Sequence, residues 1–412
     1  METYRGQDTP ENPDMSPYRP MTHFGDLAKE IYQRGLAGQR PDLPMTADGL
    51  EAAARHVLPA EALSYVAGGA STERTMAANR EAFARWRIVP RMLRGVTERD
   101  LSTTVLGTPM TAPVLTAPIG VLGLVHPDAD LAVTRAAAAL GLASVLSTAS
   151  STTLEDVAAA APDAPRWFQL YWSRDPELAE SLVRRAAAAG YRAIVVTVDT
   201  WSLGWRPRDL ALAHLPFLQR KGIANYLSDP VFQARLSAPP EESEHAMQAA
   251  IGVWMELFGN PALSWSDLSR LQEWTRLPVL VKGICHPDDA RAALDHGVDG
   301  LVVSNHGGRQ VDGSRATLDC LPGVVAAVDG RAPVLLDSGI RCGADVLIAL
   351  ALGAHAVLLG RPWVYGMALA GQRGVEHVLR VILADVDLTL ALAGYARPAD
   401  LGADSVVREA VG

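Results

Sequence analysis

Eight short apolar segments recur along the chain, and most of them are separated by alanine-rich stretches with an amphipathic pattern. Short apolar runs that alternate with helix-like segments are typical of βα units around a parallel sheet. Eight such units in succession favour closure of the sheet into a barrel. The predicted strands cover residues 113–120, 143–148, 167–172, 193–199, 278–283, 300–305, 333–339 and 356–361.

The segments between these strands have the length and composition of helices. A chain of 412 residues can hold one (β/α)₈ barrel of about 250 residues with additions. We therefore predict an α/β fold, a TIM barrel with a helical N-terminal extension. The helices expected between the strands cover residues 128–140, 154–161, 176–189, 287–296, 321–328 and 344–352.

The barrel domain is expected to span residues 44–401. An N-terminal extension over residues 1–43 would wrap a neighbour or stay loose, and residues 402–412 would form a C-terminal tail. Ahead of the first barrel strand we expect helices over residues 47–57 and 59–66, with residues 82–90 leading into a hairpin.

About 78 residues separate the fourth and fifth predicted strands. Loops longer than about 15 residues in a compact domain are usually functional segments such as lids. This one contains Trp201, Trp205, Arg206 and Tyr226, followed by a charged stretch around residues 238–244. We interpret it as a lid over an active site.

Composition excludes several classes of function. The net charge of −9 provides no basic field that would attract nucleic acid or an anionic membrane. No apolar run reaches about 18 residues and no secretory signal is recognisable, so we expect a soluble, cytoplasmic protein. Three cysteines without a Cys-x-x-Cys pattern indicate neither a disulfide framework nor a zinc site, and no metal is predicted.

Polar residues end the predicted strands, where the active sites of such barrels form. The loop 304–313 is the most informative, because its Ser-Asn-His-Gly-Gly-Arg sequence supplies a base, His306, and a carboxylate clamp, Arg309. That combination suits chemistry on a small acid. The alternative is that His306 caps the strand and Arg309 is a surface residue. The other strand-end residues are Gln169, Tyr171, Thr197, Asp199, Lys282, Ser304, Asp337 and Arg361.

The ends of the last two strands indicate a phosphate-bearing cofactor. Asp337-Ser338-Gly339-Ile340-Arg341 and Gly360-Arg361 place backbone amides and two guanidiniums where barrels commonly bind phosphate. The alternative is a pair of solvated arginines beside turn glycines.

The chain resembles the FMN-dependent 2-hydroxy acid oxidase and dehydrogenase family from about residue 25 to residue 401, and within it the lactate 2-monooxygenase branch. The resemblance rests on an ordered series of motifs. They are LSYVAGGA at 63–70, PRML at 90–93, APIG at 117–120, FQLY at 168–171, TVDTW at 197–201, GWRPRDL at 204–210, the loop 304–313 and DSGIR at 337–341.

This resemblance implies a role for each matching residue. His306 would remove a proton from the substrate and Asp199 would pair with it, while Arg206 and Arg309 would hold the substrate carboxylate. Lys282 would lie beside the flavin, where a fixed cation stabilises negative charge on the reduced ring. The implied substrate contacts are Tyr65, Tyr171, Ala149 and Tyr226. The implied FMN contacts are Pro118, Ile119, Gly120, Ser147, Gln169, Thr197, Lys282, Ser304, Asp337, Gly339, Arg341, Gly360 and Arg361.

Two features bear on the substrate that the resemblance implies. Ala149 stands where plant-type glycolate oxidases carry a tryptophan, which favours an acid of lactate size or larger. Tyr226 belongs to a segment similar to the lid of the lactate monooxygenase group, although packing within the lid is its simpler role. The leading expectation is oxidative decarboxylation of L-lactate with O₂, by a homotetramer or larger homo-oligomer. The alternatives are an oxidase that releases hydrogen peroxide, on an acid as large as mandelate, and a flavin- or phosphate-binding barrel without turnover.

Overall fold

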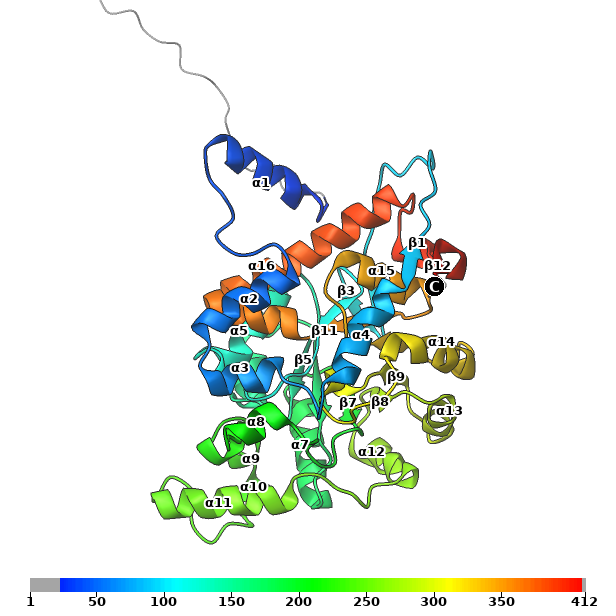
Figure 1. Ribbon diagram of the computed structural model, residues 1–412. Coiled ribbons are helices and arrows are strands. Elements are labelled where there is room, and N and C mark those ends of the chain that lie inside the picture. The colour runs from blue at the N-terminus through cyan, green and yellow to red at the C-terminus, as the bar shows by residue number, and fades with distance from the viewer. Residues whose placement is uncertain (1–22, 410–412) are drawn as a thin grey trace, which may run out of the picture.

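Eight parallel strands form a closed barrel in the computed structural model, which describes residues 23–409 (Figure 1). Strands β4 to β9 follow one another around the ring in chain order, and β10 and β11 close it between β9 and β4. Each of the eight predicted segments overlaps one strand, so the predicted TIM barrel is confirmed. The barrel strands are β4 (Val114–Thr116), β5 (Ser144–Ser147), β6 (Arg166–Leu170), β7 (Ile194–Thr197), β8 (Val279–Ile284), β9 (Gly300–Val303), β10 (Val334–Leu336) and β11 (Ala356–Leu359).

Local sequence signals set the beginnings of several outer helices. The Asp175 side chain accepts hydrogen bonds from the backbone N–H of Glu177 and Leu178, and Pro176 occupies the first turn of its helix. Both are favoured at helix N-termini. The helices that follow the strands are α5 (Ala129–Ala139), α6 (Leu154–Ala160), α7 (Pro176–Ala188), α13 (Pro287–Asp295), α14 (Thr317–Val328), α15 (Gly343–Ala351) and α16 (Arg361–Leu392).

The core has two layers. Side chains such as Trp167, Val195 and Leu358 fill the inside of the barrel, while a larger apolar cluster lies between the strands and the helices. The hairpin of β2 (Thr103–Val105) and β3 (Thr108–Met110) contributes to the inner cluster, and Trp167 Nε1 donates to Thr108 Oγ1 at 3.0 Å. A filled interior leaves the ends of the strands as the place for a site.

The segments before the barrel pack against its outer helices and against the loop that follows β9. They include α1 (Asp26–Leu36), α2 (Ala47–Val57), α3 (Ala60–Ala67) and α4 (Arg74–Ala84). The hairpin expected after residues 82–90 is the β2–β3 pair, whereas β1 (Trp86–Ile88) pairs instead with β12 (Val406–Arg408). The first 22 residues of the extension lie outside the described residues.

The segment between β7 and β8 carries several helices joined by loops and is drawn in green to yellow-green at the lower part of Figure 1. It is anchored by Asn225, which is fully buried. The Asn225 amide accepts from the Leu154 N–H at 2.8 Å and donates to Ser150 Oγ at 2.8 Å. Its helices are α8 (Pro207–Ala211), α9 (Ala224–Leu227), α10 (Pro230–Gln233), α11 (Glu244–Leu257) and α12 (Ser269–Trp274).

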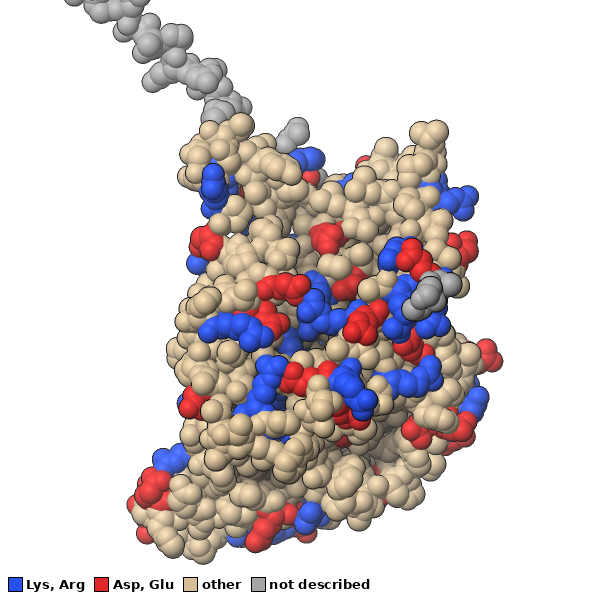
Figure 2. Space-filling model, viewed as in Figure 1, with Lys and Arg blue, Asp and Glu red and all other residues tan. Residues whose placement is uncertain are grey.

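Charged side chains of both signs are interspersed over the face shown in Figure 2, where no broad basic area is seen. This agrees with the negative net charge of the chain. Within residues 23–409, none of the helices, the long α16 included, is both long and apolar enough to cross a membrane.

Candidate active site

A cavity of about 1040 Å³, including its open mouth, lies at the carboxyl ends of the barrel strands. The strand ends contribute Lys282, His306 and Asp337 to its lining, and the lid contributes Leu203, Arg206, Phe217 and Phe258. A concave site with an apolar wall and a few convergent polar groups is the usual form of a small-molecule site.

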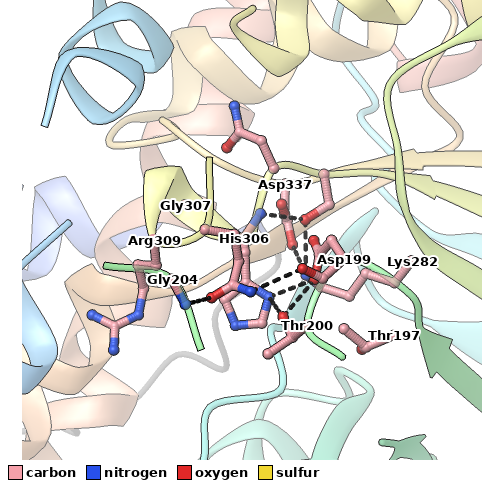
Figure 3. A network of polar contacts seen from close by, with 12 residues as sticks. Thr197, Asp199, Thr200, Gly204, Lys282, His306, Gly307, Arg309 and Asp337 are labelled. Atoms are coloured by element: carbon pink, nitrogen blue, oxygen red, sulfur yellow. Dashed lines mark hydrogen bonds and ion pairs between the residues drawn. The ribbon is translucent and has the colours of Figure 1, made fainter. Parts of the chain in front are cut away.

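His306 lies in a three-membered network with Asp199 and Thr200 (Figure 3). Its Nδ1 is 2.9 Å from Asp199 Oδ1 and 2.9 Å from Thr200 Oγ1, and the Thr200 hydroxyl donates to the same carboxylate oxygen at 2.7 Å. A carboxylate can only accept, so the Nδ1 of His306 carries the proton. Its Nε2 then keeps a lone pair, which is what a general base needs.

The backbone at His306 is held in an unusual conformation. Its φ of +58° lies in the left-handed region, which residues with a side chain rarely adopt. Asn305 stabilises this turn by accepting from the Gly308 N–H at 3.1 Å and by a reciprocal amide pair with Asn79. A Cβ at Gly308 would lie 2.6 Å from the Met76 nitrogen, so only glycine fits there. Such strain is typical of functional positions.

Burial and charge shift the pKa values of the pair in opposing ways. Burial lowers the pKa of His306, and the nearby Asp199 carboxylate opposes this without cancelling it. Burial alone would raise the pKa of Asp199, but the charge and hydrogen bond of His306 bring it below its usual value. At neutral pH the pair therefore consists of a carboxylate and a neutral imidazole.

Two arginines face the cavity close to each other. The Arg309 guanidinium lies 4.9 Å from the centre of the Tyr65 ring and donates to the Gly68 carbonyl at 2.9 Å. Arg206 Nε donates to the Arg309 carbonyl at 3.2 Å. Burial, together with the charge of Arg309, lowers the pKa of Arg206 to about 10. Adjacent guanidiniums of this kind favour binding of an anion, because an anion relieves their repulsion.

Lys282 is a buried cation at the floor of the cavity. Its ammonium lies 3.0 Å from Asp337 Oδ2 and donates to Ser304 Oγ at 2.8 Å. Burial would lower the pKa of Lys282, but the carboxylates of Asp337 and Asp199 raise it above its usual value. The lysine is therefore charged throughout the physiological range.

Further cations line the end of the cavity next to the last two strands. Arg361 donates to the carbonyls of Val66, Gly307 and Gly68, and burial followed by the charge of Arg309 lowers its pKa to about 9. The nitrogens of the Arg361 side chain are thus already hydrogen-bonded to the protein. Backbone amides and Arg341 therefore remain as the groups that could bind a phosphate. Within residues 23–409, no carboxylate forms an ion pair with any of the arginines of this cavity. These are Arg206, Arg309, Arg341 and Arg361.

Most of the predicted site residues lie together. The cavity is lined by Tyr65, Pro118, Ile119, Gly120, Ala149, Tyr171, Arg206, Lys282, His306, Arg309, Asp337, Gly339, Arg341, Gly360 and Arg361. Ser147, Gln169 and Thr197 form a hydrogen-bonded chain within the strand ends instead of lining it. Asp199 and Ser304 contact the lining residues His306 and Lys282.

Tyr226 does not reach the cavity. Its ring is fully buried within the lid, 6.0 Å from Phe232 and 6.1 Å from Trp254 between ring centres. Phe217 and Phe258 line the cavity instead, and sequence reasoning missed them because an apolar ring in a long loop gives no sign of the direction it faces. Thr200 was also missed, although its position next to Asp199 was a usable signal.

Comparison with known proteins identifies the family of the chain. The model of the FMN-dependent dehydrogenase family matches residues 54–408. The chain belongs to this family. It is similar to an L-lactate oxidase of Lysinibacillus sphaericus (strain C3-41), with 45% identity over 365 residues, which are 89% of this chain and 93% of the relative. It is also similar to 2-hydroxyacid oxidase 1 of Homo sapiens, with 43% identity over 343 residues, 83% of this chain and 90% of the relative.

Solved structures of this kind share the fold. A mandelate oxidase with 3,3-difluoro-2-hydroxy-3-phenylpropionic acid matches with a TM-score of 0.76 and 39% identity, over 87% of this chain and 97% of that one. The protein is thus an FMN-dependent oxidoreductase of 2-hydroxy acids. Membership of this enzyme family argues against a binding barrel without turnover. The residues present fit FMN. Within residues 23–409, Arg341 and Arg361 at the end of the cavity next to β10 and β11 have no carboxylate partner to compete with a phosphate, and a charged lysine lies at the cavity floor.

Proposed function

We propose that the protein is a lactate 2-monooxygenase, which acts on a small L-2-hydroxy acid and converts L-lactate and O₂ to acetate, CO₂ and water. The observation that carries this proposal is the cavity in which His306, Arg206 and Arg309 converge under an anchored lid. A carboxylate between the two guanidiniums would bring the hydroxyl-bearing carbon of a small acid close to the base.

Each polar residue has a proposed task. Arg206 and Arg309 bind the substrate carboxylate, with Tyr65 and Tyr171 completing the pocket. His306 takes a proton from the substrate through Nε2, and Asp199 stabilises the resulting imidazolium. Because both arginines are buried or half-buried cations, the carboxylate that they bind is also a favourable electrostatic partner for them.

FMN, when bound, supplies an acceptor for the two electrons that the acid loses. Lys282 would lie beside the flavin ring and hold a positive charge there. Gly339, Arg341 and the backbone of Gly360 and Arg361 would hold its phosphate. The remaining contacts proposed for the cofactor are Pro118, Ile119, Gly120, Ser147, Gln169, Thr197, Ser304 and Asp337.

The lid supports the choice of monooxygenase. An oxidase must release its 2-oxo acid before oxygen has reacted, whereas a monooxygenase retains it, and lid opening often sets the rate of product release. Asp229 in this lid is fully buried, with its carboxylate 2.8 Å from the Arg185 guanidinium. Phe217 stacks on Trp254 with 4.4 Å between ring centres, which joins the cavity wall to α11. Such anchoring favours a long residence of the product.

The lid anchor gives a first prediction. Asn225→Ala removes the buried hydrogen bonds to the Leu154 N–H and Ser150 Oγ, so the lid should open more readily. We expect the product ratio to shift from acetate and CO₂ towards pyruvate and hydrogen peroxide, measured by chromatography and a peroxide assay. Gln248→Ala, on the exposed side of α11, is the control and should leave the ratio unchanged. An unchanged ratio in Asn225→Ala would contradict the proposed role of the lid.

The function itself is tested with the purified protein. L-lactate should bleach the flavin spectrum without oxygen, and with oxygen the carbon should appear as acetate and CO₂. Absence of bleaching by lactate and by larger 2-hydroxy acids would overturn the proposed activity. Stoichiometric pyruvate and peroxide would show an oxidase instead.

An oxidase acting on a bulkier acid is the second candidate. It is favoured by the small Ala149 in the cavity wall, and mandelate oxidase, a structural neighbour, has been solved with a phenyl-bearing acid. In this chain the lid narrows the cavity beside Ala149. A Cβ at Gly222 would lie 2.9 Å from the Ala149 carbonyl oxygen and 3.0 Å from the Phe217 ring, so these residues are neighbours.

Phe217 should therefore limit the size of the substrate side chain. Phe217→Ala is expected to raise kcat/KM for L-mandelate relative to L-lactate by about tenfold or more, because removal of a buried ring leaves a cavity that a phenyl group can fill. Steady-state rates on both acids measure the ratio, and flavin content checks folding. Leu218→Ala, at an exposed neighbouring position, is the control. If mandelate is already the better substrate of the parent protein and its oxidation releases stoichiometric hydrogen peroxide, the second candidate holds.

We also propose that residues 44–401 form the catalytic domain. The protein is further proposed to assemble as a homotetramer or larger homo-oligomer. Exposed aromatic side chains at the beginning of the lid, Trp201 and Trp205, support contact with a second copy. Light scattering coupled to size-exclusion chromatography tests the assembly.

A further inference from the structure

Gln310 makes four hydrogen bonds with residues 199–206, which form the first segment of the lid. Its Oε1 accepts from the Gly204 N–H at 3.2 Å and from the Arg206 guanidinium at 2.9 Å. Its Nε2 donates to the Asp199 carbonyl at 2.9 Å and to the Ser202 carbonyl at 2.8 Å. One side chain thus joins the loop after β9 to the beginning of the lid.

The chemistry at this position requires a carboxamide. Two backbone carbonyls face one end of the side chain, and two N–H donors face the other. A carboxamide presents two N–H donors and an oxygen with two lone pairs, so it satisfies all four partners at once. A carboxylate would set oxygen against the two carbonyls, and a hydrocarbon would leave all four groups without this partner.

These contacts determine the orientation of Arg206. Its Nε is engaged by the Arg309 carbonyl and its Nη2 by Gln310, so two of the three guanidinium nitrogens are held from the protein side. Arg206 is only 8% exposed and lines the cavity. The guanidinium plane is therefore fixed before a ligand arrives, which lowers the cost of binding. In Figure 3, Gly204 and the Arg309 side chain both lie to the left of His306.

We propose that Gln310 is a positioning residue, which acts through Arg206 by fixing its guanidinium and the first segment of the lid against the loop of His306 and Arg309. This inference rests on the proposed function in one respect, namely that Arg206 binds the substrate carboxylate. It assigns no proton transfer to Gln310.

The test measures binding of pyruvate, a carboxylate that cannot be oxidised by this chemistry, from the change it causes in the flavin absorbance of the FMN-loaded protein. Gln310→Glu places a carboxylate beside Arg206 and should raise the Kd of pyruvate about tenfold or more. Gln310→Met, which adds no charge, should raise it by a smaller factor of about threefold or more. Gln219→Glu is the same substitution at an exposed position of the lid and should leave the Kd unchanged.

A double-mutant cycle separates positioning from a purely structural role. In an Arg206→Met background there is no guanidinium to orient, so Gln310→Glu should change the Kd by less than about twofold. Losses that multiply in the double variant, or a Kd within twofold of the parent in Gln310→Glu alone, would overturn the inference. Arg206→Met with unchanged affinity would instead refute the proposed carboxylate clamp, and this inference with it. The single variants therefore distinguish the two failures.

Discussion

Replacement of His306 by glutamine is expected to leave FMN bound while lowering the rate of flavin bleaching by lactate about 10³-fold, within the usual range for loss of a general base. Glutamine can still donate to Asp199, so the network at Nδ1 is partly kept. It has no basic nitrogen at the position of Nε2. Anaerobic stopped-flow absorbance measures the rate, and the spectrum of the purified variant reports the bound flavin.

The control for this substitution is His56→Gln, which changes an exposed histidine at the end of α2. It should bleach at the parental rate. Parental bleaching in His306→Gln would show that another group takes the proton. Loss of flavin from His306→Gln would show that the turn after β9 supports the cofactor site, and the rate would then be measured with FMN added in excess.

The barrel could be predicted because its signals are local. Runs such as 300–305 are too apolar for a surface loop, and the proline-led helices after β6 and β8 have their N-terminal signals in the sequence. The partner of β1 could not be predicted in the same way. Its pairing with β12 joins residues about 320 positions apart, and no turn residue near residue 88 specifies such a contact.

The residues of the candidate site also fall into those with local sequence signals and those without them. His306, Arg309 and Lys282 follow strands, so the fold alone places their side chains at one end of the barrel. Phe217 and Tyr226 both lie in the lid, but one lines the cavity and the other packs inside the lid. That difference depends on how the lid helices pack against one another. Gln310 shows its role only when its four partners, from a segment more than a hundred residues away, are known.

Asp199→Asn is expected to cause a large loss of activity, and the pH dependence of the remaining activity should shift in a definite direction. An asparagine can donate to Nδ1 of His306, which would place the ring proton on Nε2 and remove the base from the substrate side. By analogy with the histidine-orienting aspartate of serine proteases, kcat for flavin reduction should fall about 10³- to 10⁴-fold. The FMN spectrum should be retained.

The residual activity of Asp199→Asn should extend to lower pH than that of the parent. Burial lowers the pKa of His306, and the Asp199 charge is the main effect that raises it again. Without that charge the pKa falls further, so the neutral imidazole persists as the pH decreases and the acid limb of kcat/KM moves down. Asp163→Asn, at an exposed position, should leave the limb in place. If the acid limb of kcat/KM moved to higher pH, Asp199 would not act on His306 through its charge. If the acid limb did not move, a group other than His306 would be responsible for it.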